Sequence, residues 1–542
     1  MRAMKPVPKR GAVAAAVVAV LVPAWSAQAQ TIPPVPGSSA AQASQPAPAA
    51  MPPSTYVVPS VTVLGTQTNN ALAGTGRPPH ADTVLDVIPR LFLQSSHARW
   101  QLQGDLSLHG AYFAQGTNPD VVAPQGHAGL HTEWVKNLLF LDAGFSATQG
   151  AVSPYVGQGG ALQGTSYTTT QWRISPYIDR ELRPGLRFVA RSDDTWTRTS
   201  NTPSQSALNG GRYLQQSLRL EQRPQVLGYA LEARQSYSSY DGDPYGWLRD
   251  TTLRAIGELA MGQHAQFGLI GGREKVQGAS SDVSSSIYGL RVDWRPGFYG
   301  QLGATVEHRF FGTGWNLTAA AGTPQARLRL DWRRDAVSST APLGGTTGGS
   351  LVTTQASNIG ELLNSLLVTR YPNPLERARA VQDLLGSAGL PASLATSGNF
   401  YVGTTVLQND LALTGLLLRG RNSLALSVYR NRVENLFLPG QEVLQALQVR
   451  SVNTMQTGWA LNFGHRLTPL ANLNVTLQRE SDTGFGTNQG LSAVSRVMIV
   501  QIDRRLSERT TGLVGVRRRL LASTLVAGGN ESAVFAGLVH RF

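Results

Sequence analysis

From Tyr56 almost to its last residue, this chain alternates apolar and polar side chains with a period of two. The clearest stretch runs from Trp100 to Tyr112, where one face carries Trp100, Leu102, Leu106, Leu108 and Tyr112. Asp105 and His109 fall on the other face, with glutamine and serine. Because successive side chains of a strand point to opposite faces, the pattern predicts strands that are apolar on one side and polar on the other. The chain is therefore expected to be all-β.

Alternation alone does not separate a soluble sandwich from a membrane barrel, since both have one apolar face. Three further features favour the membrane: strands of about ten residues or more, aromatic residues at the strand ends, and a last segment, Val534 to Phe542, that ends on an aromatic residue. We predict a transmembrane antiparallel up-and-down β-barrel in the bacterial outer membrane. Its partners would include membrane lipid, lipopolysaccharide and the barrel-assembly machinery, for which Phe542 is the predicted signal.

The connections between predicted strands alternate in length, as they do in bacterial outer-membrane barrels with short periplasmic turns and longer external loops. Longer polar stretches include 115–125, 150–165, 200–211, 277–283 and 483–489. Counting strands in this way gives roughly 22, within a range of 18 to 22. An even number places both ends of the barrel in the periplasm. Tight turns are predicted at 95–97, 135–137, 183–185, 223–225, 261–263, 295–297, 419–421, 467–469 and 507–509.

The region before the first predicted strand has two parts. Residues 1–29 resemble a secretory signal, with Arg2, Lys5, Lys9 and Arg10 ahead of an apolar run and small residues at its end. Residues 30–53 are rich in proline, alanine and serine and carry no charge, so they are predicted to be a disordered periplasmic leader. The barrel itself is predicted to occupy residues 54–542.

Composition agrees with an exported β-rich protein. Charged residues make up 15% of the chain, mean hydropathy is −0.14, and cysteine is absent, which excludes disulfides and cysteine-bound metals. The net charge of +14 comes almost wholly from arginine. Genome composition, contacts with anionic lipid, and a cationic lumen are the alternatives for this excess. Nucleic-acid binding is not expected, because the arginines are dispersed rather than clustered.

One segment breaks the alternation. Residues 351–397 show helical spacing, first from Ile359 to Leu367 and then from Pro374 to Gly386. The order of turns predicts that this insertion leaves from the external end of a strand. A partial plug of the lumen, a cap and a helical hairpin over the rim are the alternatives for its position.

Charged residues on the polar face are the candidates for lining the lumen. Two repeated pairs place an arginine and an aspartate two residues apart, so that both point to the same side. These pairs are interpreted either as salt bridges that stiffen the wall or as a polar track for sugar hydroxyls or acidic polymers. The predicted lumen residues are Asp105, His109, Arg291, Asp293, Arg327, Arg329, Asp331 and Arg333.

No catalytic, nucleotide-binding or metal-binding motif is present in the sequence, so no enzyme activity and no cofactor is predicted. His109 beside Ser107, and the pair His127 and His131, are more simply polar wall residues than catalytic groups. Asp193-Asp194 and the aspartates at 241 and 243 are better explained by turns than by calcium.

The chain resembles the outer-membrane β-barrel family associated with exopolysaccharide gene clusters and the PEP-CTERM sorting system, a branch of the β-barrel porins. The resemblance lies in short motifs spread over the mature chain; the last residues differ, because His540 stands where this family tends to have tyrosine. The motifs are Pro59-Ser60-Val61-Thr62-Val63, Trp100-Gln101-Leu102-Gln103-Gly104, Leu139-Phe140-Leu141-Asp142-Ala143, Val152-Ser153-Pro154-Tyr155, Ile174-Ser175-Pro176-Tyr177 and His308-Arg309-Phe310-Phe311-Gly312.

The resemblance implies a role in exopolysaccharide secretion or envelope export, with exopolysaccharide or export proteins as further partners. A general diffusion porin, a non-conducting surface scaffold and a barrel enzyme are the alternatives. A TonB-dependent receptor is not expected, because residues 30–53 are too short to form its N-terminal plug.

Overall fold

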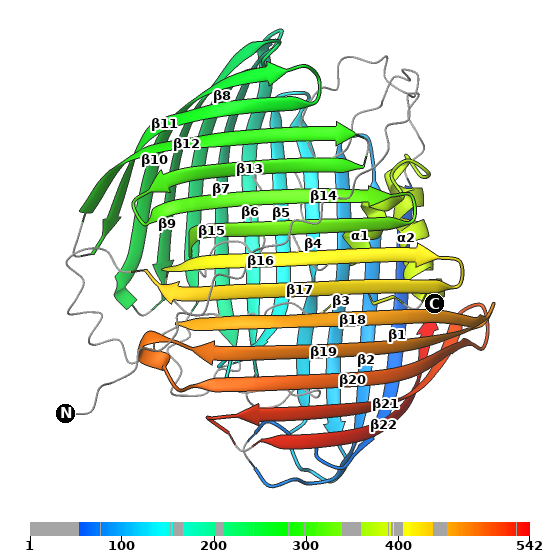
Figure 1. Cartoon of the computed structure of the whole chain (residues 1–542). Coiled ribbons are helices and arrows are strands. Elements are labelled where there is room, and N and C mark those ends of the chain that lie inside the picture. The colour runs from blue at the N-terminus through cyan, green and yellow to red at the C-terminus, as the bar shows by residue number, and fades with distance from the viewer. Residues whose placement is uncertain are drawn as a thin grey trace, which may run out of the picture. The chain divides into compact units, whose positions relative to one another are not determined.

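Each strand of the sheet hydrogen-bonds to the next in antiparallel fashion, and the last strand pairs with the first (Figure 1). The closing register runs from Ser60 opposite Arg541 to Thr68 opposite Ala533. This computed structural model describes residues 54–75, 77–151, 153–155, 166–200, 210–241, 243–279, 282–297, 299–338, 359–388, 390–391, 394, 405–436, 453–526 and 528–542. The predicted signal and leader lie outside the described residues. All the described residues belong to one compact unit, Pro48–Phe542.

The first eleven strands are β1 (Ser54–Thr68), β2 (Asp82–Ser96), β3 (Trp100–Phe113), β4 (Val121–Val135), β5 (Leu139–Ala151), β6 (Ser166–Arg183), β7 (Leu186–Ser200), β8 (Gly211–Gln222), β9 (Leu227–Tyr240), β10 (Asp243–Met261) and β11 (Ala265–Gly278). The others are β12 (Asp282–Gly297), β13 (Gly300–Arg309), β14 (Gly312–Thr323), β15 (Ala326–Ser338), β16 (Thr405–Arg419), β17 (Asn422–Asn435), β18 (Thr454–Thr468), β19 (Ala471–Gly484), β20 (Ser492–Arg505), β21 (Thr510–Ser523) and β22 (Gly529–Arg541). Two α-helices, α1 (Ile359–Leu366) and α2 (Pro374–Ala388), and a short 3-10 helix, η1 (Gly486–Asn488), complete the described elements.

The predicted fold class is confirmed: the described strands number 22 and form a closed antiparallel barrel. Large apolar side chains are exposed along the outer face of the strands, for example Leu108 and Tyr112 on β3 and Leu290 and Trp294 on β12. Such a band of apolar side chains on the outside, with polar side chains inside, is the arrangement that a lipid bilayer stabilises. Among the described residues, no helix is long and apolar enough to cross a membrane.

One end of the barrel has only short connections, as predicted. The other end mixes long and short ones: the connections β9–β10, β11–β12 and β13–β14 contain two or three residues, so the predicted alternation is wrong there. The connections from each even-numbered strand to the next contain two to four residues, and all nine predicted tight turns fall at such positions. A tenth short turn, at Pro324 and Gln325, was not predicted. There the Thr323 hydroxyl accepts hydrogen bonds from the backbone N–H groups of Gln325 and Ala326, at 3.3 and 3.1 Å. Threonine is a weaker turn signal in a sequence than glycine or asparagine. The short-turn end is the periplasmic end of the barrel.

The two predicted helices are present, and their position decides among the three alternatives. β15 ends and β16 begins at the external end, as predicted, yet α1 and α2 lie beside the short turns at the periplasmic end (Figure 1). They pack on side chains of the inner face, including Leu416 of β16 and Ala425 of β17. The helices are therefore inside the lumen, and neither a cap nor a hairpin over the rim describes them.

Candidate functional site

The inner wall of the barrel carries a dense set of ion pairs, and the predicted lumen residues belong to it. Asp105 accepts a hydrogen bond from Nε of Arg90 at 2.6 Å, and His109 Nε2 lies 2.8 Å from Asp86 Oδ1. Both Asp105 and His109 project from the face of β3 opposite to the exposed Leu108 and Tyr112, which is the inner face.

The two repeated pairs are ion pairs within their own strands. Arg291 Nε lies 2.8 Å from Asp293 on β12, and Arg329 Nε lies 2.7 Å from Asp331 on β15. Arg327 donates to the backbone carbonyl of Tyr299 at 2.9 Å. Arg333 stands opposite Asp410 of β16 in the strand register. That these residues line a path for a solute remains a prediction.

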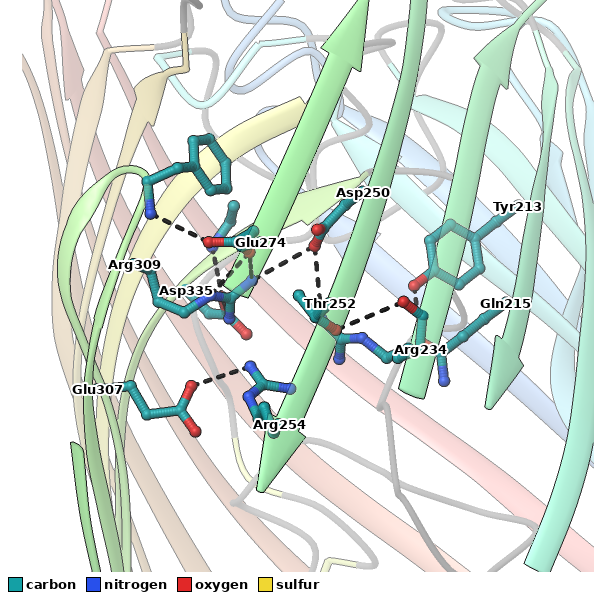
Figure 2. Close-up of polar contacts among 12 residues, drawn as sticks. Tyr213, Gln215, Arg234, Asp250, Thr252, Arg254, Glu274, Glu307, Arg309 and Asp335 are labelled. Carbon is teal, nitrogen blue, oxygen red and sulfur yellow. Dashed lines mark hydrogen bonds and ion pairs between the residues drawn. The ribbon is translucent and has the colours of Figure 1, made fainter. Parts of the chain in front are cut away.

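A polar cluster that the sequence does not predict has Glu274 and Arg309 buried at its centre. We call it the arginine cluster: Arg234, Asp250, Glu274, Arg309 and Asp335 (Figure 2). Arg309 Nε donates to Glu274 at 2.8 Å, and its terminal nitrogens lie 3.3 Å from Asp250 and 3.7 Å from Asp335. Arg234 is 3.6 Å from Asp250. The second oxygen of Glu274 accepts the backbone N–H of Phe310 at 3.1 Å.

These residues come from β9, β10, β11, β13 and β15 near their external ends, so only the closed barrel brings them together. The side chain of Glu274 is fully buried and that of Arg309 is 6% exposed. A buried charge needs a partner, and the carboxylates here supply one for each arginine. One feature of the sequence pointed to these five residues: each lies at a strand position whose side chain points to the polar face.

A second unpredicted cluster lies on β4 to β7, nearer the periplasmic end. Asp142, whose side chain is 2% exposed, lies 2.9 Å from Arg191 and 2.8 Å from His131. Ser175 donates to Asp193 at 2.6 Å. His131 is thus a polar residue of the wall that contacts Asp142, and Asp193 pairs with Arg191 at 2.9 Å. The turn predicted at Asp193-Asp194 is wrong, because both residues lie within β7. Within the described residues, no group of three or more metal-ligating side chains is present.

The helical pair, α1 and α2, has a small apolar core that is mostly its own. Ile359, Leu362, Leu363, Leu367, Val381, Leu385, Leu390 and Leu394 are buried together, and the barrel wall adds Leu416, Ala425 and Ala460. Eight of these eleven residues belong to the insertion. The pair therefore buries its apolar side chains both against each other and against the inner wall.

Polar contacts between the helical pair and the wall are scattered. Asn472 of β19 donates to the backbone carbonyl of Gly386 at 3.3 Å, Arg329 lies 3.9 Å from Glu361, and the Arg379 guanidinium is 4.9 Å from the centre of the Tyr56 ring. Each is a contact of the kind that contributes about 1 kcal/mol or less.

Within the helical pair, Arg377 holds the linker. It donates to Asn364 Oδ1 at 2.7 Å and to the carbonyls of Tyr371 and Pro372 at 3.0 and 3.2 Å. Burial lowers the pKa of Arg377 below its ordinary value, because the charged form loses water. These hydrogen bonds offset part of that cost and fix α1 against α2.

At the external end, the segment Ser153–Tyr155, which follows β5, contacts strands from the C-terminal part of the chain. The Tyr155 hydroxyl lies 2.7 Å from Thr454 Oγ1 of β18, and its backbone carbonyl accepts from Ser523 of β21 at 2.6 Å. We call this segment the external strap. The described elements thus approach the lumen at both ends, the strap outside and the helical pair at the periplasmic end.

Comparison with known proteins gives no family. No protein-family model and no curated protein matches the chain. Among solved structures, the siderophore receptor PirA from Acinetobacter baumannii is 10% identical, with a TM-score of 0.43, and the match covers 90% of this chain and 80% of that one. The FrpB iron transporter from Neisseria meningitidis is 9% identical, with a TM-score of 0.44 over 90% of this chain and 81% of that one.

OccK1 from Pseudomonas aeruginosa is 9% identical, with a TM-score of 0.32 over 90% of this chain and 99% of that one. What identifies the present chain is its own architecture: a closed barrel, an apolar outer face, and one end at which every connection between the described strands is short. The chain is a 22-stranded β-barrel of the bacterial outer membrane.

Proposed function

We propose that this barrel transports a polar solute across the outer membrane and that the helical pair is its gate. The observation that carries the proposal is the position of α1 and α2, packed on the inner wall at the periplasmic end while their chain connections leave from the external end. Most residues of this core belong to the insertion, which would let the pair move as one body. The polar contacts described between the pair and the wall are individually weak, so that movement would cost little free energy.

The solute that the wall suits best is polar and weakly charged. Several inner-wall arginines, such as Arg90, Arg291 and Arg329, have a carboxylate neighbour. Paired charges give a wall rich in hydrogen-bond donors and acceptors with little net field. Sugar hydroxyls exchange hydrogen bonds with such groups, which supports the exopolysaccharide role implied by the sequence resemblance. No catalytic activity is part of this proposal.

The gate can be tested by locking it in place. The chain has no cysteine, so the pair Gly386→Cys and Asn472→Cys would be joined selectively by a short thiol cross-linker. Single-channel conductance in a planar bilayer would be compared before and after cross-linking, and after its reversal. We expect the locked protein to be silent and the unlocked protein to show openings. The single cysteine variants, treated with the same reagent, are the controls.

Deletion of residues 351–397 provides the second measurement. A steady pore after deletion, together with silence after cross-linking, supports a gated channel. A pore of the same conductance with and without the insertion would refute the gate and leave an open diffusion porin. Silence in the deletion variant, provided its barrel is folded by heat-modifiable mobility, would refute transport and favour a surface scaffold.

The exopolysaccharide role needs a separate test. Loss of secreted polymer on deletion of the gene, restored by the wild-type chain and not by the cross-linked one, would support it. Normal polymer secretion in the deletion strain would contradict it.

A further inference from the structure

The lipid-facing surface carries a group of arginines that the inner wall and the gate do not explain. These arginines lie on the same face of the sheet as the exposed apolar residues Val428, Trp459, Met498 and Val516. They are Arg430 of β17, Arg479 of β19, Arg496 of β20 and Arg518 of β21. All four side chains are exposed. They therefore point outward, on the face that contacts the membrane.

The register brings three of these arginines close together, while Arg430 lies two strands away from Arg479. Arg479 and Arg496 stand directly opposite each other on adjacent strands, and Arg518 is the diagonal neighbour of Arg496. Directly opposite side chains have their Cβ atoms about 5 Å apart, and diagonal ones about 7–8 Å. Like charges at these separations repel each other and destabilise the sheet, so the arrangement calls for an anion.

The protein does not supply that anion in the part of the chain that the structure describes. None of the four arginines lies within 4.0 Å of a carboxylate there, in contrast to Arg291, Arg309 and Arg329 of the inner wall. Arg518 donates to the hydroxyl of Ser532, which is neutral. Arginine on the lipid face without a counter-ion is costly unless it meets the anionic headgroup region.

The position of Arg496 along its strand matches the height of the headgroup region. On β20, Arg496 and Arg504 are eight residues apart, with Met498, Val500 and Ile502 on the lipid face between them. Eight residues of a strand tilted by about 40° span about 20 Å across the membrane, close to the apolar band of about 25 Å in such barrels. Arg504 lies at the periplasmic end, so Arg496 marks the external edge of the band.

We propose that Arg479, Arg496 and Arg518 form a binding site for the phosphate groups of lipopolysaccharide in the outer leaflet, with Arg430 two strands away at its edge. Two guanidinium groups a few ångströms apart can each give two hydrogen bonds to one phosphate, which converts their repulsion into attraction. The acyl chains of the same molecule would then lie along the apolar residues between Arg496 and Arg504. Trp459, beside Arg479 on β18, adds an aromatic side chain at the level of the headgroup.

The test uses the whole folded chain in detergent and purified lipopolysaccharide as the probe. Retention of lipid would be measured by native mass spectrometry for the wild type, for Arg479→Gln with Arg496→Gln, and for Arg504→Gln with Arg509→Gln. The last pair removes two exposed periplasmic arginines and is the matched control. We expect affinity for lipopolysaccharide to fall about tenfold in the first variant and to be unchanged in the control.

Two further measurements identify what the site recognises. Arg479→Lys with Arg496→Lys keeps the charge and should retain part of the binding, which separates loss of charge from misfolding. Dephosphorylated lipopolysaccharide should bind the wild type weakly. Equal loss in the control variant, or equal retention of phosphatidylglycerol and lipopolysaccharide by the wild type, would overturn the proposal in favour of unspecific attraction to anionic lipid.

Discussion

The Tyr240 hydroxyl lies 2.7 Å from the Ser338 hydroxyl, although their strands, β9 and β15, are six places apart in the barrel. Tyr240 is also 3.4 Å from Oγ1 of Thr405 at the start of β16. The contact draws two separate parts of the external end together. In the same sector, the inner face of β9 to β12 is filled by Ala230, Ile256, Ile270 and Ile287, all buried.

Replacing Tyr240 by phenylalanine should lower the free energy of unfolding by about 1 kcal/mol, because one buried hydroxyl contact is lost while the ring stays. Unfolding by urea, followed by tryptophan fluorescence in lipid vesicles, would measure the change. Tyr229→Phe, on the lipid face of the same strand, should have almost no effect. Equal stability of the two variants would show that the Tyr240 contact does not hold the two sectors together.

Burial should decide how much each ion pair contributes. The Glu274 carboxylate is fully buried against Arg309, so Glu274→Gln would leave that guanidinium short of a charge partner and cost about 3 kcal/mol. The Asp293 carboxylate is hydrated, because 40% of its side chain is exposed. Asp293→Asn should therefore lower the free energy of unfolding by less than about 1 kcal/mol. The same urea measurement compares them. A larger loss for Asp293→Asn would contradict this ranking.

If the predicted inner-wall residues line the path, removing one charge should change ion selectivity. Arg291→Ala leaves Asp293 without its arginine, so the permeability of the open channel should shift toward cations. Reversal potentials in a salt gradient, measured on the variant lacking residues 351–397, would show the shift. Arg479→Ala, on the lipid face, is the control and should leave selectivity unchanged. Identical selectivity in both variants would leave Arg291 a purely structural role.

The external strap should be insensitive to pH over the physiological range. Burial raises the pKa of Tyr155 above its ordinary value of 10.0, so its neutral hydroxyl, which contacts Thr454, persists below that pH. The contribution to stability is full below pH 10 and is lost as pH rises through the raised pKa, because only the neutral form fits the buried site. Tyr155→Phe should loosen the strap at every pH below 10.

Labelling of a single introduced cysteine would follow the strap. Maleimide reaction of Ser153→Cys, normalised to Gln115→Cys in another external loop, should be slow and constant between pH 6 and 9 in the otherwise wild-type chain. Adding Tyr155→Phe should speed the reaction at all these pH values. A normalised rate that rises between pH 6 and 9 without that substitution would refute the assignment.

The strands, the face to which each side chain points and nine short turns could be predicted from local sequence. The face of a side chain depends only on its place in the strand, and a turn depends on a few adjacent residues. The Arg291–Asp293 and Arg329–Asp331 pairs were visible for the same reason, since both partners lie two residues apart on one strand. The arginine cluster could not be predicted in this way, because Arg309 contacts Glu274 only after β11, β12 and β13 have paired in register.

Local sequence patterns were enough to predict a barrel of roughly 22 strands, within a range of 18 to 22, and a helical insertion after a strand that ends externally. They were enough because alternation, turn residues and helical spacing are local properties of the chain. The tertiary structure decided that the helical pair lies inside the lumen at the periplasmic end, that Tyr240 meets Ser338, and that Arg479 faces Arg496 toward the lipid. These depend on register, barrel curvature and contacts between distant segments, and no window of sequence contains both partners.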